Sequence, residues 1–254
     1  MFAHRGGAGL TPENTIAAFD RGLAEGADGL EFDVRLSRDG VPVVIHDATL
    51  DRTTDAAGPV AARTARELAG VDAGHRFQPA QGFPWRGRGA GVPTLREVLD
   101  RYRVCPLIVE LKEDRRELVA AAVDEIRRAD AVSRVCLGSF HWRAIGMARR
   151  MAPEIATSAS GPEIRLSMWM SKVGLPMWRP SFDAYQVPEV RHDVTIVTER
   201  FVAMARRAGV PVQVWVVDGV DDIRRLLGWG VEGIISDRPD IASREVHGGV
   251  DRLS

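Results

Sequence analysis

Strand-like and helix-like segments alternate along almost the whole chain, and this alternation limits the folds that the sequence can adopt. Such alternation is typical of a parallel sheet with helices packed outside it. Nine segments have the apolar, β-branched character of strands, and most are followed by a segment with helical periodicity. The predicted strands are Phe2–Arg5, Leu30–Val34, Val41–His46, Leu107–Lys112, Arg134–Ser139, Ile155–Ser158, Asp183–Val187, Pro211–Val217 and Gly233–Ser236.

The third predicted strand, Val41–His46, has to run antiparallel to the second. The connection Ser37–Gly40 is a tight turn ending in Gly40, a residue type that tolerates positive φ. Parallel neighbours need a crossover of about a dozen residues or more. Without this return strand eight strands remain, the number that closes a TIM barrel. We therefore predict an α/β fold, a (β/α)8 TIM barrel with an antiparallel hairpin after strand 2, as a single domain over residues 1–254.

Two segments interrupt or follow the alternation. Residues 46–92 are rich in Gly, Ala, Pro and Arg, and contain one predicted helix near Thr64–Leu68. A loop-rich insertion of this length in a compact domain is more often functional than accidental. Residues 243–254 are predicted to form a loose tail.

The hairpin and the first strand bring chemically active side chains together. Glu31 and Asp33 are spaced i, i+2, which puts both carboxylates on one face of a strand. Counting outward from the turn, His46 is expected roughly opposite Glu31. His4 and Arg5 end the first strand. Carboxylates bind hard cations, imidazoles transfer protons near neutral pH and guanidinium groups match phosphate oxygens, so this set indicates metal-assisted chemistry on a phosphate.

Later strands carry further polar residues toward the same place. Glu110 and Lys112 share one face of their strand, and Gln213 and Trp215 share one face of another. Active sites of such barrels lie at the carboxyl ends of the strands. Buried charges need partners, and a cation shared by Glu110 and the two hairpin carboxylates would supply one. A structural ion pair would explain Glu110 and Lys112 by themselves; the additional carboxylates favour a metal site.

Composition excludes some other classes of protein. The formal net charge of −1 argues against a nucleic-acid-binding role based on bulk charge. We find no apolar run of about eighteen residues, as a transmembrane helix would need. His4 follows Met1 too closely for a cleavable signal segment, so we expect a cytoplasmic protein. Cys105 and Cys136 lie in or beside apolar segments and are expected to be reduced thiols.

Several motifs in the first fifty residues resemble the opening signature of the glycerophosphodiester phosphodiesterase family. They are HRG, PENT, an E-x-D strand, a D-G turn, a terminal HD and R-T-T, in the order typical of that family. The resemblance continues with PTLREVL at 93–99, VELK at 109–112, VWVVD at 214–218 and GIISDRPD at 233–240. It therefore extends over nearly the whole chain.

The resemblance implies an activity and a set of residue roles. Members of the family hydrolyse a glycerophosphodiester to sn-glycerol 3-phosphate and an alcohol, and in related barrels a neighbouring glycerol hydroxyl attacks phosphorus. It implies Glu31, Asp33 and Glu110 as ligands of one divalent cation, Mg²⁺ or Ca²⁺, and His4 and His46 as general acid and base. The remaining candidates, which would bind the phosphate or substrate, are Arg5, Glu13, Asn14, Lys112, Gln213 and Trp215. It also implies that the insertion covers the barrel mouth.

Two other functions remain compatible with these motifs: lysophospholipase-D-like hydrolysis of lysophospholipids, and a non-enzymatic barrel that binds phosphoryl ligands. The expected partner is a small-molecule diester and no nucleic acid. The segment 162–180 is unusually apolar, and we expect a helix that ends near Val173, before Gly174 and Pro176. This segment either packs on the barrel exterior or contacts lipid tails or a membrane surface.

Overall fold

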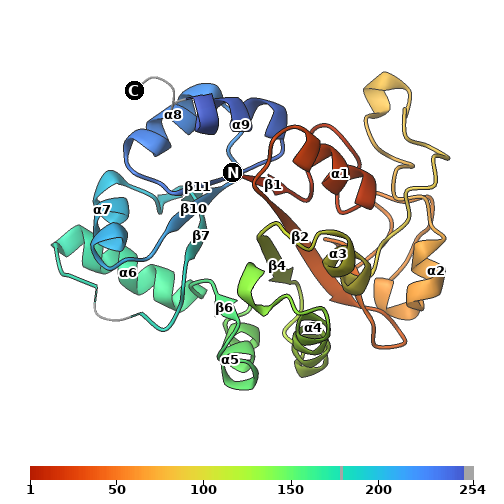
Figure 1. Cartoon of the computed structure of the whole chain (residues 1–254), viewed down its shortest axis with the longest axis horizontal. Helices are drawn as coiled ribbons and strands as arrows, with labels where there is room; N and C mark the ends of the chain where they lie inside the picture. Colours follow the sequence, from red (N-terminus) through yellow and green to blue (C-terminus); the bar gives the residue numbers. More distant parts are fainter. Residues whose placement is uncertain (178–179, 249–254) are drawn as a thin grey trace.

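Eight parallel strands form the centre of the computed structural model, which describes residues 1–177 and 180–248 (Figure 1). They pair in the order β6-β5-β4-β2-β1-β11-β10-β7. A parallel bridge between Ser158 and Ala184 joins the two end strands, which closes the sheet into the predicted (β/α)8 barrel. The strands are β1 (Phe2–His4), β2 (Gly29–Leu36), β4 (Leu107–Leu111), β5 (Val135–Gly138), β6 (Ala156–Thr157), β7 (Tyr185–Pro188), β10 (Val212–Trp215) and β11 (Gly233–Ser236).

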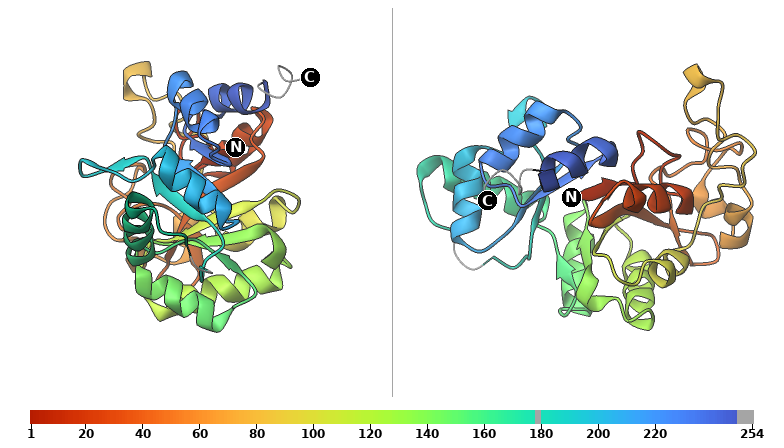
Figure 2. Two further views of the ribbon diagram at one scale, coloured as in Figure 1. Left: turned by 90° about the vertical axis from the view of Figure 1, so that its left-hand side faces the viewer. Right: turned by 45° about the horizontal axis from the view of Figure 1, so that its top comes forward.

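Helices surround the barrel, as Figures 1 and 2 show. Their apolar faces pack on the strands: α4 buries Leu118, Ala122 and Ile126, which are spaced four residues apart. Threonine side chains cap the first turn of α3 and α7, at Thr94 and Thr198. The helices are α1 (Ile16–Ala24), α3 (Leu95–Arg101), α4 (Arg116–Arg128), α5 (Trp142–Met151), α6 (Gly161–Val173), α7 (Glu199–Arg207), α8 (Val220–Gly228) and α9 (Pro239–Gly248), with a short 3-10 turn η3 (Val132–Arg134). No helix in residues 1–177 and 180–248 is long and apolar enough to span a membrane.

The predicted hairpin is present, but its register differs from our count. β3 (Pro42–Val44) runs antiparallel to β2, and Val34 lies opposite Val44. The expected pairing of Glu31 with His46 is therefore wrong, because an extension of this register would place Asp47 opposite Glu31. The turn sets the register: the Ser37 backbone donates a hydrogen bond to the carbonyl of Val41, and the Ser37 hydroxyl accepts one from the Val41 amide.

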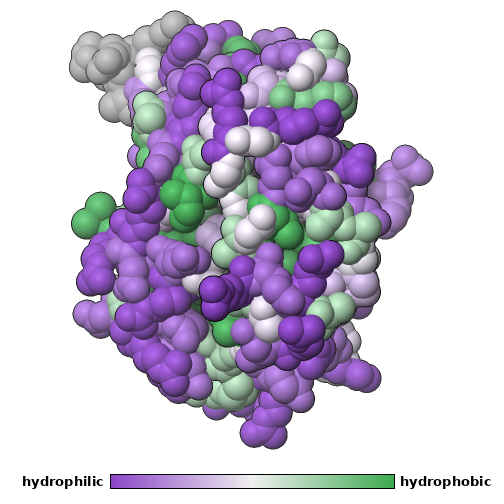
Figure 3. Space-filling view, turned by 90° about the vertical axis from the view of Figure 1, so that its right-hand side faces the viewer, coloured by the Kyte–Doolittle hydropathy of each residue, from purple (hydrophilic) through white to green (hydrophobic). Residues whose placement is uncertain are grey.

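The insertion contains only short helices: η1 (Val60–Ala62), α2 (Ala65–Ala69) and η2 (Pro79–Gln81). It has a small apolar cluster of its own, which includes Leu50, Val60 and Leu68 and packs against β3. In Figure 1 it lies at the right, outside α1 and α3. Figure 3 shows this side of the molecule, where hydrophilic side chains predominate and apolar ones form separate small patches.

Two features at the carboxyl-terminal half differ from the sequence prediction. The loose tail expected from residue 243 is wrong for residues 243–248, which belong to α9; residues 249–254 lie outside the described part. α9 is held by the Ser243 hydroxyl, which donates to the carbonyl of Glu25. A hairpin of β8 (Val190–Arg191) and β9 (Val194–Thr195) was not predicted, because its turn uses His192 and Asp193 at positive φ instead of glycine.

Candidate active site

A cavity of about 780 Å³ opens at the carboxyl ends of the barrel strands. This is the end at which barrel enzymes place their active sites. Seven of the residues predicted for the site line this cavity: His4, Arg5, Glu31, His46, Glu110, Lys112 and Trp215.

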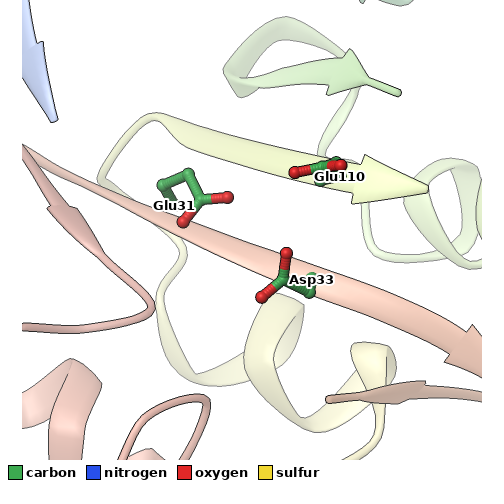
Figure 4. Close-up of side chains that lie close together, drawn as sticks. All are labelled: Glu31, Asp33 and Glu110. Atoms are coloured by element: carbon green, nitrogen blue, oxygen red, sulfur yellow. The ribbon is translucent and has the colours of Figure 1, made fainter. Parts of the chain in front are cut away.

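The three predicted metal ligands lie together at the base of the site. β2 pairs with β4 so that Asp33 is directly opposite Glu110, and Figure 4 shows the carboxylates of Glu31, Asp33 and Glu110 pointing toward one another. Each offers an oxygen atom, and these atoms lie within 4.8 Å of one another. Among the described residues, the buried oxygens Asp33 Oδ1 and Glu110 Oε1 accept no hydrogen bond. Closely spaced oxygens without hydrogen-bond donors fit a hard divalent cation.

Lys112 neutralises part of this negative charge. Its Nζ lies 2.9 Å from Asp33 Oδ1, an ion-pair contact without hydrogen-bond geometry, and 2.9 Å from Glu110 Oε2. Burial lowers the pKa of the Lys112 ammonium, but the two carboxylates outweigh burial and raise it. Lys112 therefore stays charged. Ion pairs with Lys112 account for the burial of the Asp33 and Glu110 carboxylates, but Lys112 forms no ion pair with Glu31.

Glu31 is a buried carboxyl whose ionised form lacks sufficient compensation in the site. Burial, with smaller contributions from Asp33 and Glu110, raises the pKa of Glu31 to about 7, while His4 opposes the shift. Burial likewise raises the pKa of Glu110, against the effect of Lys112. Asp33 differs, because Lys112 and Arg5 outweigh burial and lower its pKa. Positive charge placed among the three carboxylates would favour their ionised forms.

His4 is oriented by a carboxylate at the far end of the chain. Its Nδ1 lies 2.7 Å from Oδ1 of Asp237, and its Nε2 lies 3.8 Å from Glu31 Oε2. The backbone amide of Asp237 donates to Asp218 Oδ1, which fixes the loop after β11. Burial lowers the pKa of His4, but Glu31 and Asp237 outweigh it, and the net pKa is raised. Because Nδ1 is bonded to a carboxylate, Nε2 is the nitrogen left for proton transfer.

His46 has the same arrangement with its own sequence neighbour. Its Nδ1 lies 2.6 Å from Asp47 Oδ1, and Arg52 Nε donates to Asp47 Oδ2 over 2.6 Å. Arg52 and His46 outweigh burial and lower the pKa of Asp47 to about 2, so that this carboxylate is ionised. The pKa of His46 itself is lowered, chiefly by burial. The two histidines therefore share one geometry but have pKa shifts of opposite sign.

Glu13 and Asn14 stand behind the cavity wall and hold residues that line it. The Asn14 amide nitrogen donates to Asp33 Oδ2 over 2.8 Å, and its oxygen accepts from the Asp33 backbone amide. Glu13 accepts hydrogen bonds from Arg5 and Arg52. The Arg5 backbone amide in turn donates to Glu31 Oε2. These residues thus position the first loop around the carboxylate cluster.

Of the two residues predicted on β10, Trp215 lines the cavity and Gln213 does not. The Trp215 ring packs edge-on against Phe140, with ring centroids 5.7 Å apart. Gln213 lies deeper in the barrel, where its side-chain oxygen accepts a hydrogen bond from Gln186 over 3.0 Å. Gln213 and Trp215 are two residues apart on β10, which corresponds to about 6.6 Å along the strand. This distance places Gln213 in the layer of side chains below the cavity wall.

Sequence reasoning missed the carboxylates that orient the histidines. Asp47 and Asp237 belong to the motifs HD and SDRPD, which were visible in the sequence, but their roles depend on contacts with a histidine. The outer cavity wall was also unexpected. It is formed by Phe140 after β5, by α6 and by the β8–β9 hairpin, whereas no lining residue comes from 47–92. The insertion reaches the edge of the site through Arg52, and Thr53, Ala73 and Val92 lie beside Glu13, Asn14 and His46 at a small neighbouring cavity.

Comparisons with known proteins agree over nearly the whole chain. Residues 4–241 match the model of the glycerophosphoryl diester phosphodiesterase family. A glycerophosphodiester phosphodiesterase of Caldanaerobacter subterraneus is 31% identical over 245 residues, which are 94% of each chain. The glycerophosphoryl diester phosphodiesterase domain of a Mycobacterium tuberculosis protein is 25% identical, with a TM-score of 0.85 over 97% of this chain and 98% of that one. A phosphodiesterase of Oleispira antarctica, solved in complex with the product sn-glycerol-3-phosphate, is 26% identical, with a TM-score of 0.77 over 97% and 96% of the two chains.

Proposed function

Because the chain belongs to the glycerophosphoryl diester phosphodiesterase family, we propose that it hydrolyses glycerophosphodiesters to sn-glycerol 3-phosphate and an alcohol. One observation carries this proposal: two histidines, each bonded through Nδ1 to a carboxylate, lie at a cavity that also holds the cluster of three carboxylates. A barrel that merely bound phosphoryl ligands would have no need of two oriented imidazoles.

In the proposed reaction His4 and His46 exchange protons with the substrate through Nε2. One histidine takes the proton of the attacking hydroxyl, either the neighbouring glycerol hydroxyl or water, and the other donates a proton to the leaving alcohol. If the glycerol hydroxyl attacks, the product of the first step is a cyclic phosphate that water opens. Asp237 and Asp47 keep both rings in the required tautomer and stabilise their protonated forms.

Charged residues at the base of the cavity would bind the phosphate. Arg5 and Lys112 line the cavity, and their cations match the phosphoryl oxygens. Glu31, Asp33 and Glu110 would hold one divalent cation, Mg²⁺ or Ca²⁺, in keeping with the buried oxygens Asp33 Oδ1 and Glu110 Oε1, which accept no hydrogen bond. When bound, such an ion offsets the charge that grows on the phosphoryl oxygens.

Glycerophosphocholine provides a direct test. Incubation with the protein should release choline and sn-glycerol 3-phosphate, and EDTA should abolish release until Mg²⁺ or Ca²⁺ is restored. Release of glycerol and phosphocholine instead would contradict the proposed bond cleavage. Binding of the diester without turnover, in the presence of either metal, would favour the non-enzymatic alternative.

A second candidate substrate is a lysophospholipid, which carries the same phosphodiester next to an acyl chain. The walls of the cavity beyond the polar cluster favour this candidate, since they are largely apolar: Phe140, Ile164, Met168, Val194, Ile196 and Trp215 line it. Hydrolysis would release the headgroup and leave lysophosphatidic acid. The relative kcat/KM for lysophosphatidylcholine and glycerophosphocholine, measured below the micelle concentration, distinguishes the two substrates.

A further inference from the structure

Large apolar side chains are exposed at one end of the barrel and almost nowhere else in the part of the chain that the structure describes. Of ten such exposed residues, nine follow the carboxyl ends of β5, β6, β7 or β10, and only Val104 lies at the opposite end, before β4. We name these nine the mouth rim: Phe140, Trp142, Leu166, Trp169, Val173, Leu175, Val190, Val194 and Val216. Grouped apolar exposure of this kind marks an interaction surface, whereas scattered single residues do not.

Helix α6 is the main element of the mouth rim, and its polarity is reversed. Its exposed face carries Leu166, Trp169 and Val173, which are 57%, 54% and 53% exposed. The opposite face buries Ser167 and Ser171, and the Ser167 hydroxyl accepts a hydrogen bond from the Tyr185 hydroxyl over 2.6 Å. An ordinary surface helix would turn the leucine, tryptophan and valine inward and the serines outward. The burial of the serines fixes this orientation, so the apolar stripe stays in contact with solvent.

The position of α6 places this stripe on an accessible end of the molecule. Figure 1 shows α6 from the side at nearly its full length, whereas α5 is foreshortened. In the left view of Figure 2, α5 is seen at full length and α6 is foreshortened. α6 therefore lies crosswise to α5. In that view of Figure 2, α6 and the β8–β9 hairpin lie at the same end of the molecule. Both line the cavity, so the mouth rim borders the cavity entrance on the side of β5, β6, β7 and β10.

Cations that lack an ion-pair partner accompany the apolar side chains, and two of them, Arg143 and Arg191, lie over the rings of Trp142 and Phe140. Arg143, Arg165, Lys172 and Arg191 form no ion pair with any residue in 1–177 or 180–248. Two of the nearby carboxylates are neutralised, Glu163 by Arg149 and Glu189 by Arg225. Asp193 at the hairpin tip and Glu199 at the start of α7 are exposed acids that pair with no cation in 1–177 or 180–248. In α6, Arg165 and Lys172 are seven residues apart and therefore lie along one flank of the stripe.

We propose that the mouth rim docks on a lipid surface that contains anionic headgroups. The apolar stripe would enter the interface between headgroups and acyl chains, and the cations would contact the anionic headgroups. A second copy of this chain fits less well, because a twofold contact would place the same cations against one another. Docking in this orientation would direct the cavity entrance toward the membrane.

Vesicle co-sedimentation tests this proposal with the full chain. The wild-type protein should pellet with vesicles of phosphatidylcholine and phosphatidylglycerol, and less with phosphatidylcholine alone. The variant Leu166→Ala/Trp169→Ala/Val173→Ala should lose roughly tenfold or more in partitioning, because most of the inserted apolar area is removed. The control is Val104→Ala, which truncates an apolar side chain that is 98% exposed at the opposite end of the barrel. This variant should partition like wild type.

A variant that removes one positive charge tests the electrostatic contribution to vesicle binding separately from the apolar contribution. Lys172→Gln should reduce binding to the anionic vesicles roughly fivefold without changing binding to phosphatidylcholine. Arg150→Gln, a change of equal charge in the last turn of α5, is the matched control. Added salt should weaken the binding of wild type more than that of Lys172→Gln.

Three results would overturn the proposal. The first is wild-type protein that remains in the supernatant with anionic vesicles. The second is equal partitioning of the stripe variant and Val104→Ala. The third is a dimer of the wild-type protein in analytical ultracentrifugation together with a monomer of the stripe variant, since the surface would then be covered by a second copy.

The stripe residues do not line the cavity, so unchanged hydrolysis of glycerophosphocholine shows that the variant is folded. Sedimentation requires no turnover, so this inference and the proposed hydrolysis can fail separately.

Discussion

The Nδ1 atom of His4 lies 2.7 Å from Oδ1 of Asp237, a residue 233 positions further along the chain. The contact exists because β1 and β11 are adjacent and parallel, with Ala3 opposite Ser236. The residues that follow these two positions emerge side by side at the carboxyl end of the barrel. Closure of the barrel thus brings a carboxylate from the last strand to a histidine on the first.

Asp237→Asn is expected to lower kcat roughly tenfold or more with little change in KM, because the amide orients the ring less firmly and does not stabilise its protonated form. Loss of the carboxylate should also lower the pKa of His4, so the limb of the pH–rate profile that reports this group should move to lower pH. Asp240→Asn, which removes a partner of Arg238 in the first turn of α9, is the control. An unchanged profile in Asp237→Asn would show that Asp237 does not position His4.

His4→Ala and His46→Ala are each expected to lower kcat by roughly two to four orders of magnitude, the usual contribution of a general acid or base. A diester with a good leaving group, such as a nitrophenyl ester, should restore much of the activity of the variant that lost the general acid, because that alcohol leaves without a proton. Rescue of neither variant would mean that the assignment of two histidines is wrong.

Glu110→Gln is expected to weaken binding of Mg²⁺ or Ca²⁺ and to reduce hydrolysis in parallel, because one of three ligand oxygens loses its charge. Calorimetric titration with each metal measures binding without substrate. Glu117→Gln on α4, whose side chain is 67% exposed, serves as the control. Wild-type metal affinity in Glu110→Gln would remove this residue from the site.

Glu163 is expected to make stability depend on pH at acidic values. Burial would raise the pKa of its carboxyl, but hydrogen bonds from Arg149 and Ser160 outweigh burial and lower it to about 2. A lowered pKa in the folded state gives stability that is present above the ordinary value of 4.5 and lost as the pH falls toward 2.

The matching measurement compares wild type with Glu163→Gln by urea unfolding at neutral and at acidic pH. The variant should be less stable near pH 7 by about 1 kcal/mol, a low figure because the side chain is partly exposed. The difference should shrink between about pH 4.5 and pH 2, as wild-type Glu163 takes up its proton. A difference that is constant with pH would contradict the shift.

The alternation of strands and helices was sufficient to predict the barrel, because hydrophobic period and capping are local properties of the sequence. Thr94 and Glu97 form the capping box that their spacing indicates. Strand ends were less exact: the predicted Val41–His46 is reduced to Pro42–Val44, since the pairing partner decides where a strand stops.

One part of the site follows from local sequence, because the spacing of Glu31 and Asp33 on one strand puts both carboxylates on one face in any sheet. The groups that surround these two carboxylates depend on contacts between distant segments. The register of β2 against β4 sets Glu110 opposite Asp33, and barrel closure sets Asp237 beside His4. The packing of α6 on the barrel likewise leaves its apolar face in solvent, because the opposite face, which carries Ser167, is bound to Tyr185. Contacts between distant segments depend on how whole strands and helices pack, which no local pattern of residues contains.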